Sequence, residues 1–239
     1  MIRETVLASA IAGIIAAIVF GLLQAVWVTP LILKGETYED AAETVAAHEE
    51  PHAVGSGHHH DPEAWKPEEG WQRTLFTLGA DVLMGIGYAF VLTAVYILWR
   101  EPTGSLQGLA FGLAGFGVFF VAPALGLPPE LPGTAAAELS SRQQWWAIIA
   151  ATTATGLLLL FSRVRWWTRL LAVALIALPH LITAPHPLVE SSLAPADLQS
   201  QFRLATTVCN GIFWLVLGLS SAAAYRRLVG PKPAPDHYI

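Results

Sequence analysis

Long apolar blocks constrain this chain more than any other feature. The region Thr5–Leu33 contains no charged residue, and several later regions are apolar along their length rather than on one helical stripe. Blocks of about 18 or more apolar residues are typical of membrane-spanning helices. Charged residues make up only 13% of the chain, whereas soluble domains carry about 25%. The sequence therefore predicts a polytopic membrane protein.

The blocks predict an all-α bundle of six transmembrane helices in a single membrane domain, residues 1–239. The first block is too long for the apolar region of a signal peptide, so we expect it to remain as a span. The fifth block is the weakest, because it is short and contains Pro179 and His180; without it the count is five. The expected helices are Thr5–Leu33, Thr74–Trp99, Ser105–Leu125, Gln143–Phe161, Trp166–Thr183 and Gln201–Tyr225.

Lysine and arginine predict the orientation, because they gather on the cytoplasmic side. With the N-terminus inside, the inner segments carry eight of these residues and the outer segments carry five. The short segment "SRVRWWTR", residues 162–169, contributes three of the eight. We therefore expect both termini to be cytoplasmic and the acidic loop 34–73 to lie outside.

Small residues at four-residue spacing predict how the helices meet. Gly104, Gly108 and Gly112 share one helical face, and Gly13, Ala17 and Gly21 share another. Such faces allow backbones to approach closely. We expect packing within one bundle rather than a dedicated dimer face.

The outer loop 34–73 combines ten acidic residues with five histidines. Neutral imidazole binds zinc, copper, nickel and cobalt(II), and carboxylates can complete such a site. Gly55-Ser56-Gly57 makes the loop pliable, which favours ion capture with rapid exchange over catalysis. The alternative is a solvated linker that binds metal incidentally. The predicted metal ligands here are His48, His52, His58, His59 and His60.

Asp81 is the strongest functional candidate inside the membrane. A carboxylate within a span is costly, so it marks a functional site by default. It lies about seven residues into the second helix from the outer side, with Met84 on the same face. His180, beside a proline in the fifth helix, is expected to share an ion with it. Cys209 and the nearby amides could also serve as ligands, but the alternative for them is an ordinary packing role.

Two further outer loops supply predicted ligands. The segment "LGLPPELPG" is stiffened by prolines that would hold Glu130 in a fixed place. The segment "LPHLITAPHPLVE" places His186 and Glu190 near His180. We therefore assign Glu130, His180 and His186 to the metal path, together with Asp81.

Several function classes are excluded. The net charge of −5 and the lack of a Lys/Arg run argue against nucleic acid. The single cysteine excludes a disulfide framework, and no G-x-x-x-x-G-K-[ST] motif is present. A non-enzymatic metal permease without a permanent cofactor is the leading hypothesis. The alternatives are an intramembrane metalloenzyme and a membrane metal sensor. The metalloenzyme is disfavoured because none of the expected membrane helices carries histidines paired at i, i+4.

Five segments of the chain are similar to the CbtA family of proposed cobalt transporter subunits. The resemblance implies uptake of a divalent transition metal, cobalt first, through the bacterial inner membrane, with a small single-span CbtB-like partner. Imidazole and carboxylate ligands leave nickel and zinc open. The matching segments are "APALGLPPELPG" (Ala122–Gly133), "RQQWW" (Arg142–Trp146), "PLILKGETYE" (Pro30–Glu39), "EAWKPEEGWQRTLFT" (Glu63–Thr77) and "LPHLITAPHP" (Leu178–Pro187).

Overall fold

The computed structural model describes residues 2–48, 67–68, 70–99, 102, 104–162 and 165–230, with the side chains of 43 and 45–48 left out. This part of the chain is helical and contains no strand, apart from one isolated bridge between Thr134 and Ser192. The all-α prediction is confirmed. The helices are α1 (Ile2–Leu23), η1 (Gln24–Val28), α2 (Thr29–His48), α3 (Trp71–Leu98), α4 (Ser105–Phe116), η2 (Gly117–Val121), α5 (Ala122–Ala124), α6 (Leu139–Phe161), α7 (Trp166–Ala177), η3 (Leu178–Leu181) and α8 (Ala196–Leu228).

Five helical stretches within the described residues are long and apolar enough to cross a membrane. The sixth predicted helix is present but short, since α7 has 12 residues and η3 adds a four-residue 3₁₀ turn. Pro179 has no N–H to continue the α-helix and lies at the start of this turn. The long stretches are Ile2–Ala42, Trp71–Leu98, Ser105–Ala124, Leu139–Phe161 and Ala196–Leu228.

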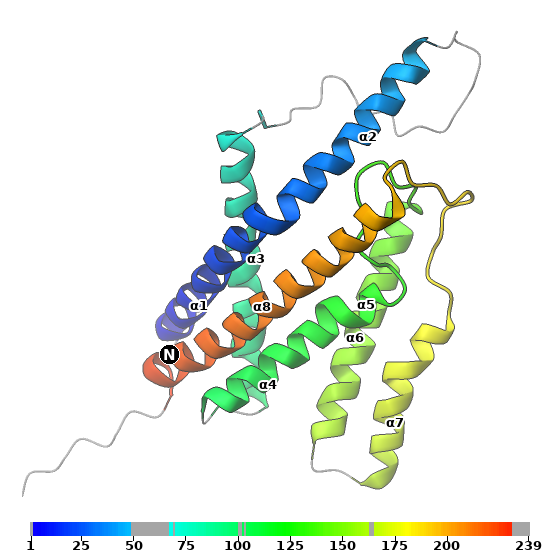
Figure 1. The fold of residues 1–239 in the computed structure, drawn as a ribbon. Helices are drawn as coiled ribbons and strands as arrows, with labels where there is room; N and C mark the ends of the chain where they lie inside the picture. The colour runs from blue at the N-terminus through cyan, green and yellow to red at the C-terminus, as the bar shows by residue number, and fades with distance from the viewer. Residues whose placement is uncertain are drawn as a thin grey trace, which may run out of the picture.

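The chain nevertheless runs back and forth in six legs, because α7 and η3 return alongside α6. Gly156 of α6 lies against Ala172 of α7, and the ring of Trp145 lies 6.4 Å from that of His180. The beginning of α6 therefore meets the end of the α7–η3 leg, as expected for antiparallel neighbours. The N-terminus accordingly lies beside the C-terminal end of α8 (Figure 1).

Contacts at matching heights define two ends of the bundle. At one end, Ser9 near the start of α1 forms a hydrogen bond with Thr93 near the end of α3. We call this end, where the first helix begins, the terminal end. At the other end, the segments 126–138 and 182–195 pair with each other, and α2 projects beyond the bundle (Figure 1). We call this the loop end. The stretch Ile2–Ala42 has 41 residues, so it is about 60 Å long, roughly twice the hydrocarbon core of a bilayer.

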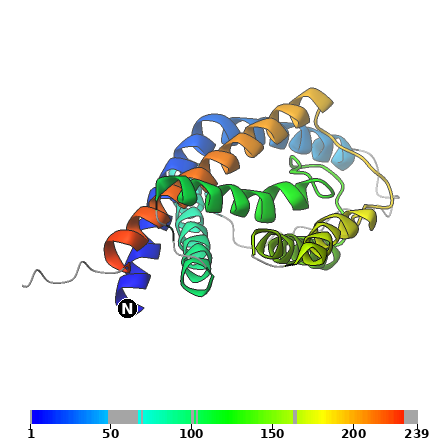
Figure 2. The same cartoon turned by 90° about the horizontal axis from the view of Figure 1, so that it is seen from below.

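Glycines bring two helix pairs into backbone contact. On the α1–α3 pair, a Cβ added to Gly13 would overlap the backbone nitrogen of Ile86. On the α4–α8 pair, a Cβ added to Gly112 would overlap the carbonyl oxygen of Trp214. Both predicted faces thus pack within the bundle, except at Gly104, where an added Cβ would meet nothing within 4 Å. Figure 2 shows α1 and α8 running along the same side of the molecule.

Two wide π-helical turns interrupt the first and third spans at equivalent places. In η1, the Thr29 N–H donates to Gln24 O; in η2, the Ala122 N–H donates to Gly117 O. The next residue is a proline in both helices, at positions 30 and 123, and it has no N–H to donate. The proline therefore cannot continue the series of i→i−5 bonds in either helix. Such turns are frequent at functional sites.

Candidate functional site

The two loop-end segments form a fixed structure. The Ala135 N–H donates to Ser191 O at 2.9 Å, and the Leu193 N–H donates to Gly133 O at 3.2 Å. Gly133 has φ of 74°, a left-handed conformation that glycine adopts without strain. These bonds hold 126–138 and 182–195 side by side at the loop end of the bundle.

Gln199 of α8 fastens the proline-rich segment to the bundle. Its Oε1 accepts the Leu131 N–H at 3.1 Å, and its Nε2 donates to Pro129 O at 3.1 Å. Leu131 is only 2% exposed and packs against Gly35 of α2. The carboxylate-bearing residue between these anchors, Glu130, therefore has a fixed backbone and an exposed side chain.

A cavity of about 1100 Å³ lies between these segments and the beginning of α6. Glu130 and His186, both predicted as ligands, line it together with Glu190. The sequence interpretation missed its two arginines, Arg142 and Arg203. Arg142 begins the "RQQWW" segment, which in the sequence carries only part of the family resemblance. The other polar lining residues are Thr134, Gln143, Ser191 and Ser192.

The cavity is not a finished metal cage. Within the described residues, no group of three His, Cys, Asp or Glu side chains is arranged so that it can hold an ion. Glu130, His186 and Glu190 are all exposed to solvent. They thus share a cavity but leave most of an ion's coordination positions to other ligands.

The beginning of α6 at the cavity edge carries a strong helix cap. Glu138 accepts hydrogen bonds from the backbone and the hydroxyl of both Ser140 and Ser141. These bonds, that of the Ser140 hydroxyl foremost, lower the pKa of Glu138 from 4.5 to about 2. Folding lowers this pKa, so the stability that the cap contributes is fully present above pH 4.5. It is lost as the pH falls towards 2.

Asp81 lies in the α1–α3 interface. It is 6% exposed, and its Oδ2 has no hydrogen-bond partner among the described residues. This oxygen lies 3.6 Å from the position a Cβ on Gly21 would take, so the missing side chain of Gly21 leaves it room. Met84 is 37% exposed and does not follow Asp81 into the interface. An unpaired carboxylate oxygen in a membrane helix is a costly arrangement.

The structure does not bring Asp81 and His180 together. Asp81 faces α1, whereas the imidazole of His180 makes its ring contact with Trp145 of α6. Helices α3 and α7 lie well apart in both views (Figures 1 and 2). In this conformation the two side chains do not form the shared site that the sequence suggested.

An aromatic chain separates the cavity from the helices around Asp81. Trp146 lines the cavity, and its ring lies 6.1 Å from that of Phe119 in η2. Phe119 stacks on Trp214 with ring centroids 5.5 Å apart, and Trp214 contacts Tyr88 at 4.8 Å. Tyr88 is two turns after Asp81 on α3. A row of aromatic rings therefore connects the cavity lining at Trp146 to α3 at Tyr88.

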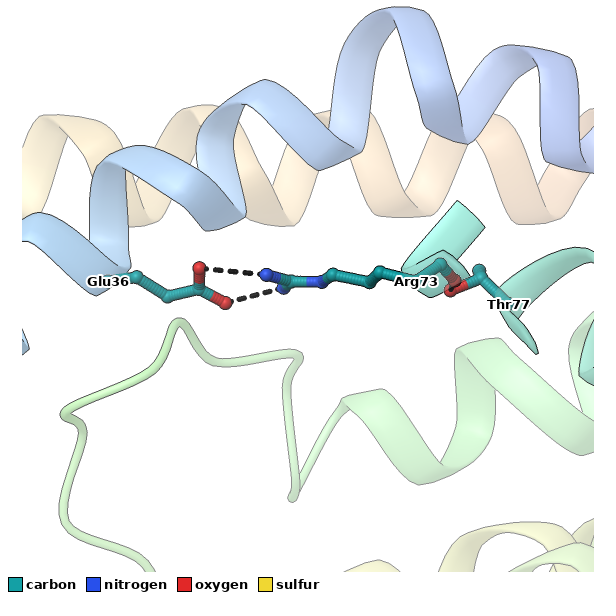
Figure 3. Close-up of polar contacts among 3 residues, drawn as sticks. All are labelled: Glu36, Arg73 and Thr77. Carbon is teal, nitrogen blue, oxygen red and sulfur yellow. Dashed lines mark hydrogen bonds and ion pairs between the residues drawn. The ribbon is translucent and has the colours of Figure 1, made fainter. Parts of the chain in front are cut away.

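An ion pair ties α2 to the beginning of α3. Both terminal nitrogens of Arg73 face the carboxylate of Glu36, at 2.5 and 3.1 Å (Figure 3). Thr77 also donates its hydroxyl to the Arg73 carbonyl. Both charged side chains are about 30% exposed, so solvent limits the pair to about 1 kcal/mol or less. The pair therefore contributes little to the stability of the fold.

The histidine-rich loop falls almost wholly outside the described residues. The backbone of α2 ends at His48, but the side chain of His48 and the whole of His52, His58, His59 and His60 are not described. Their assignment as metal ligands stays a prediction.

A family model described as "Probable cobalt transporter subunit (CbtA)" matches residues 2–226. The matched region includes the loop-end cavity, Asp81 and almost all of α8. No curated protein and no solved structure matches the chain.

Proposed function

Since the chain belongs to the CbtA family of probable cobalt transporter subunits, we propose that it carries a divalent transition-metal cation, cobalt first, through the bacterial inner membrane. Nickel and zinc are the alternatives, because imidazole and carboxylate ligands suit all three ions. A transporter subunit of this kind is not an enzyme. The word "subunit" in the family description also supports a further chain, for which a small single-span protein is our proposal.

One observation carries the proposal furthest: a fixed cavity at the loop end contains Glu130, His186 and Glu190. Oxygen and imidazole donors at the entrance to a helical bundle suit a transition-metal cation. We propose that this end is outside. A membrane potential of 100 mV would then favour entry of a divalent ion by about 4.6 kcal/mol, at 2.3 kcal/mol per charge.

We propose Asp81 as the next binding site along the path of the ion. The aromatic contact between Trp146 and Phe119 lies between the cavity and α3, so the ion can pass only after these rings move. The wide turn η2, which contains Phe119, supports such a movement because its π-helical bonding departs from that of the α-helix around it, as is frequent at functional sites. The conformation described here is therefore assigned to a closed state.

The orientation can be tested with reporters. A reporter fused after Ile239 should be cytoplasmic, and a tag inserted at Ser56 should react with reagents that do not cross the membrane. The reason is the excess of Lys and Arg near the terminal end. A periplasmic C-terminus would mean an odd number of crossings. The short α7–η3 leg would then enter the bilayer without crossing it.

Replacing the five loop histidines with glutamine should weaken uptake only at low external metal. We expect the apparent KM to rise about tenfold, with the maximal rate nearly unchanged, because a pliable capture loop raises the local ion concentration without forming the path. The measurement is initial uptake against cobalt concentration in cells. Loss of uptake at every concentration would instead make the loop part of the path.

A further inference from the structure

Two arginines of the loop-end cavity lack acidic partners among the described residues. Arg142 lines the cavity, and its Nε is buried there without a hydrogen-bond partner. Arg203 donates its Nε to Pro129 O at 3.3 Å. Within the described part of the chain, neither guanidinium forms an ion pair, although Glu130 and Glu190 line the same cavity. A cavity built only for a cation would not contain two unpaired positive charges.

The volume of the cavity also indicates a ligand larger than a metal cation. A metal ion with six waters occupies on the order of 200 Å³, at about 30 Å³ per water. The cavity has a volume of about 1100 Å³, slightly above the range of about 300–1,000 Å³ that is usual for organic ligands. The space therefore suits an ion that arrives with an organic ligand.

The protein ligands are also too few for a bare ion. The described residues contain no group of three metal-binding side chains at one point, whereas transition metals take four or more ligands. A small carboxylate chelator would supply the missing ligands. Its outer carboxylate oxygens would meet the planar, two-pronged donors of arginine, which match a carboxylate in shape.

We propose that the loop-end cavity binds the metal as a complex with a small carboxylate chelator. Glu130, His186 and Glu190 face the ion, and Arg142 and Arg203 bind the carboxylates of the chelator. The proposal rests on the transport function above and specifies the form in which the substrate reaches the site. The chemistry that it requires is a metal–polycarboxylate complex, with citrate as the probe.

The test uses the purified full-length chain in phosphatidylcholine vesicles, whose headgroups carry no net negative charge that would attract the arginines. Uptake is measured for free cobalt, for the citrate complex and for the ethylenediamine complex, which has no carboxylate. Calorimetry measures citrate binding to the chain without metal. Arg142→Gln and Arg203→Gln are the test variants, and Arg203→Lys keeps the charge but loses the two-pronged geometry. Arg169→Gln, on α7 away from the cavity lining, is the matched control.

We expect the citrate complex to have a KM at least tenfold below that of the ethylenediamine complex. Each glutamine variant should weaken citrate binding tenfold or more and remove this preference. Arg203→Lys should retain part of it, and Arg169→Gln all of it.

Absence of citrate binding to the wild-type chain would overturn the inference. Good uptake of free cobalt without any citrate preference would also overturn it, while leaving the transport function intact. Citrate binding that depends on the two arginines, without uptake of cobalt in any form, would instead contradict the transport function alone.

Discussion

Asp81→Asn should reduce cobalt uptake to less than about a tenth of the wild-type rate while the protein still inserts and folds. Asparagine keeps the shape of aspartate and removes the charge. An ionised, unpaired carboxylate within a span costs on the order of 3 kcal/mol on insertion scales, and Oδ2 of Asp81 has no partner among the described residues. The measurement is initial uptake normalised to membrane-inserted protein. Thr77→Val on the same helix is the control, since among the described residues its hydroxyl bonds only the Arg73 carbonyl of the same helix.

Near-normal uptake by a correctly inserted Asp81→Asn protein would remove Asp81 from the ion path. The carboxyl would then serve only the α1–α3 contact beside Gly21. The loop-end cavity would remain the only candidate ion site among the described residues.

Gly85→Ala should disrupt the fold, whereas Gly87→Ala, two residues further along the same helix, should not. A Cβ added to Gly85 would lie 2.6 Å from the carbonyl oxygen of Gly13, a backbone atom that cannot move aside cheaply. Overpacking of this kind costs about 1–3 kcal/mol or more. At Gly87 a Cβ meets nothing within 4 Å, and alanine favours a helix by about 1 kcal/mol over glycine.

Thermal unfolding in detergent measures this pair of variants directly. We expect the midpoint for Gly85→Ala to fall by several degrees, with more aggregated protein, and the midpoint for Gly87→Ala to stay or rise. Equal midpoints for the two variants would contradict the close α1–α3 crossing.

The helix plan was predictable because apolar block length reports directly on a span. The glycine faces on α1 and α4 were predictable for a similar reason, since the spacing of small residues marks a close approach. The fifth helix was harder to place. Pro179 turns its end into a 3₁₀ segment, so the leg exists but is too short to count among the five long spans.

The pairing of Asp81 with His180 could not be judged from the sequence. Position along a span gives the depth of a side chain, but the neighbour that it faces depends on how the helices are arranged. Here α1 covers Asp81, and α6 takes the contact with His180. The common location of Glu130 and His186 was easier to predict. Both lie in short, proline-containing loops at the same end of the bundle, where few positions are open to them.

The cavity arginines and the two wide turns gave only partial signals in the sequence. Pro30 and Pro123 each follow an apolar stretch, but nothing local shows that the preceding N–H will reach back five residues. In the sequence, Arg142 and Arg203 contribute only to the count of outer Lys and Arg residues. Their lack of an acidic partner within the described residues is a property of the folded loop end. These features need tertiary structure to be seen.

The central claim is that this chain itself contains a path for a divalent metal ion. The most direct measurement is uptake of radioactive cobalt by vesicles containing the purified chain, under an imposed inside-negative potential. The account predicts saturable uptake that increases with the potential, is inhibited by nickel and zinc, and is lost in Asp81→Asn. Uptake by the folded wild-type chain that equals that of protein-free vesicles, at every potential and cobalt concentration, would contradict the claim.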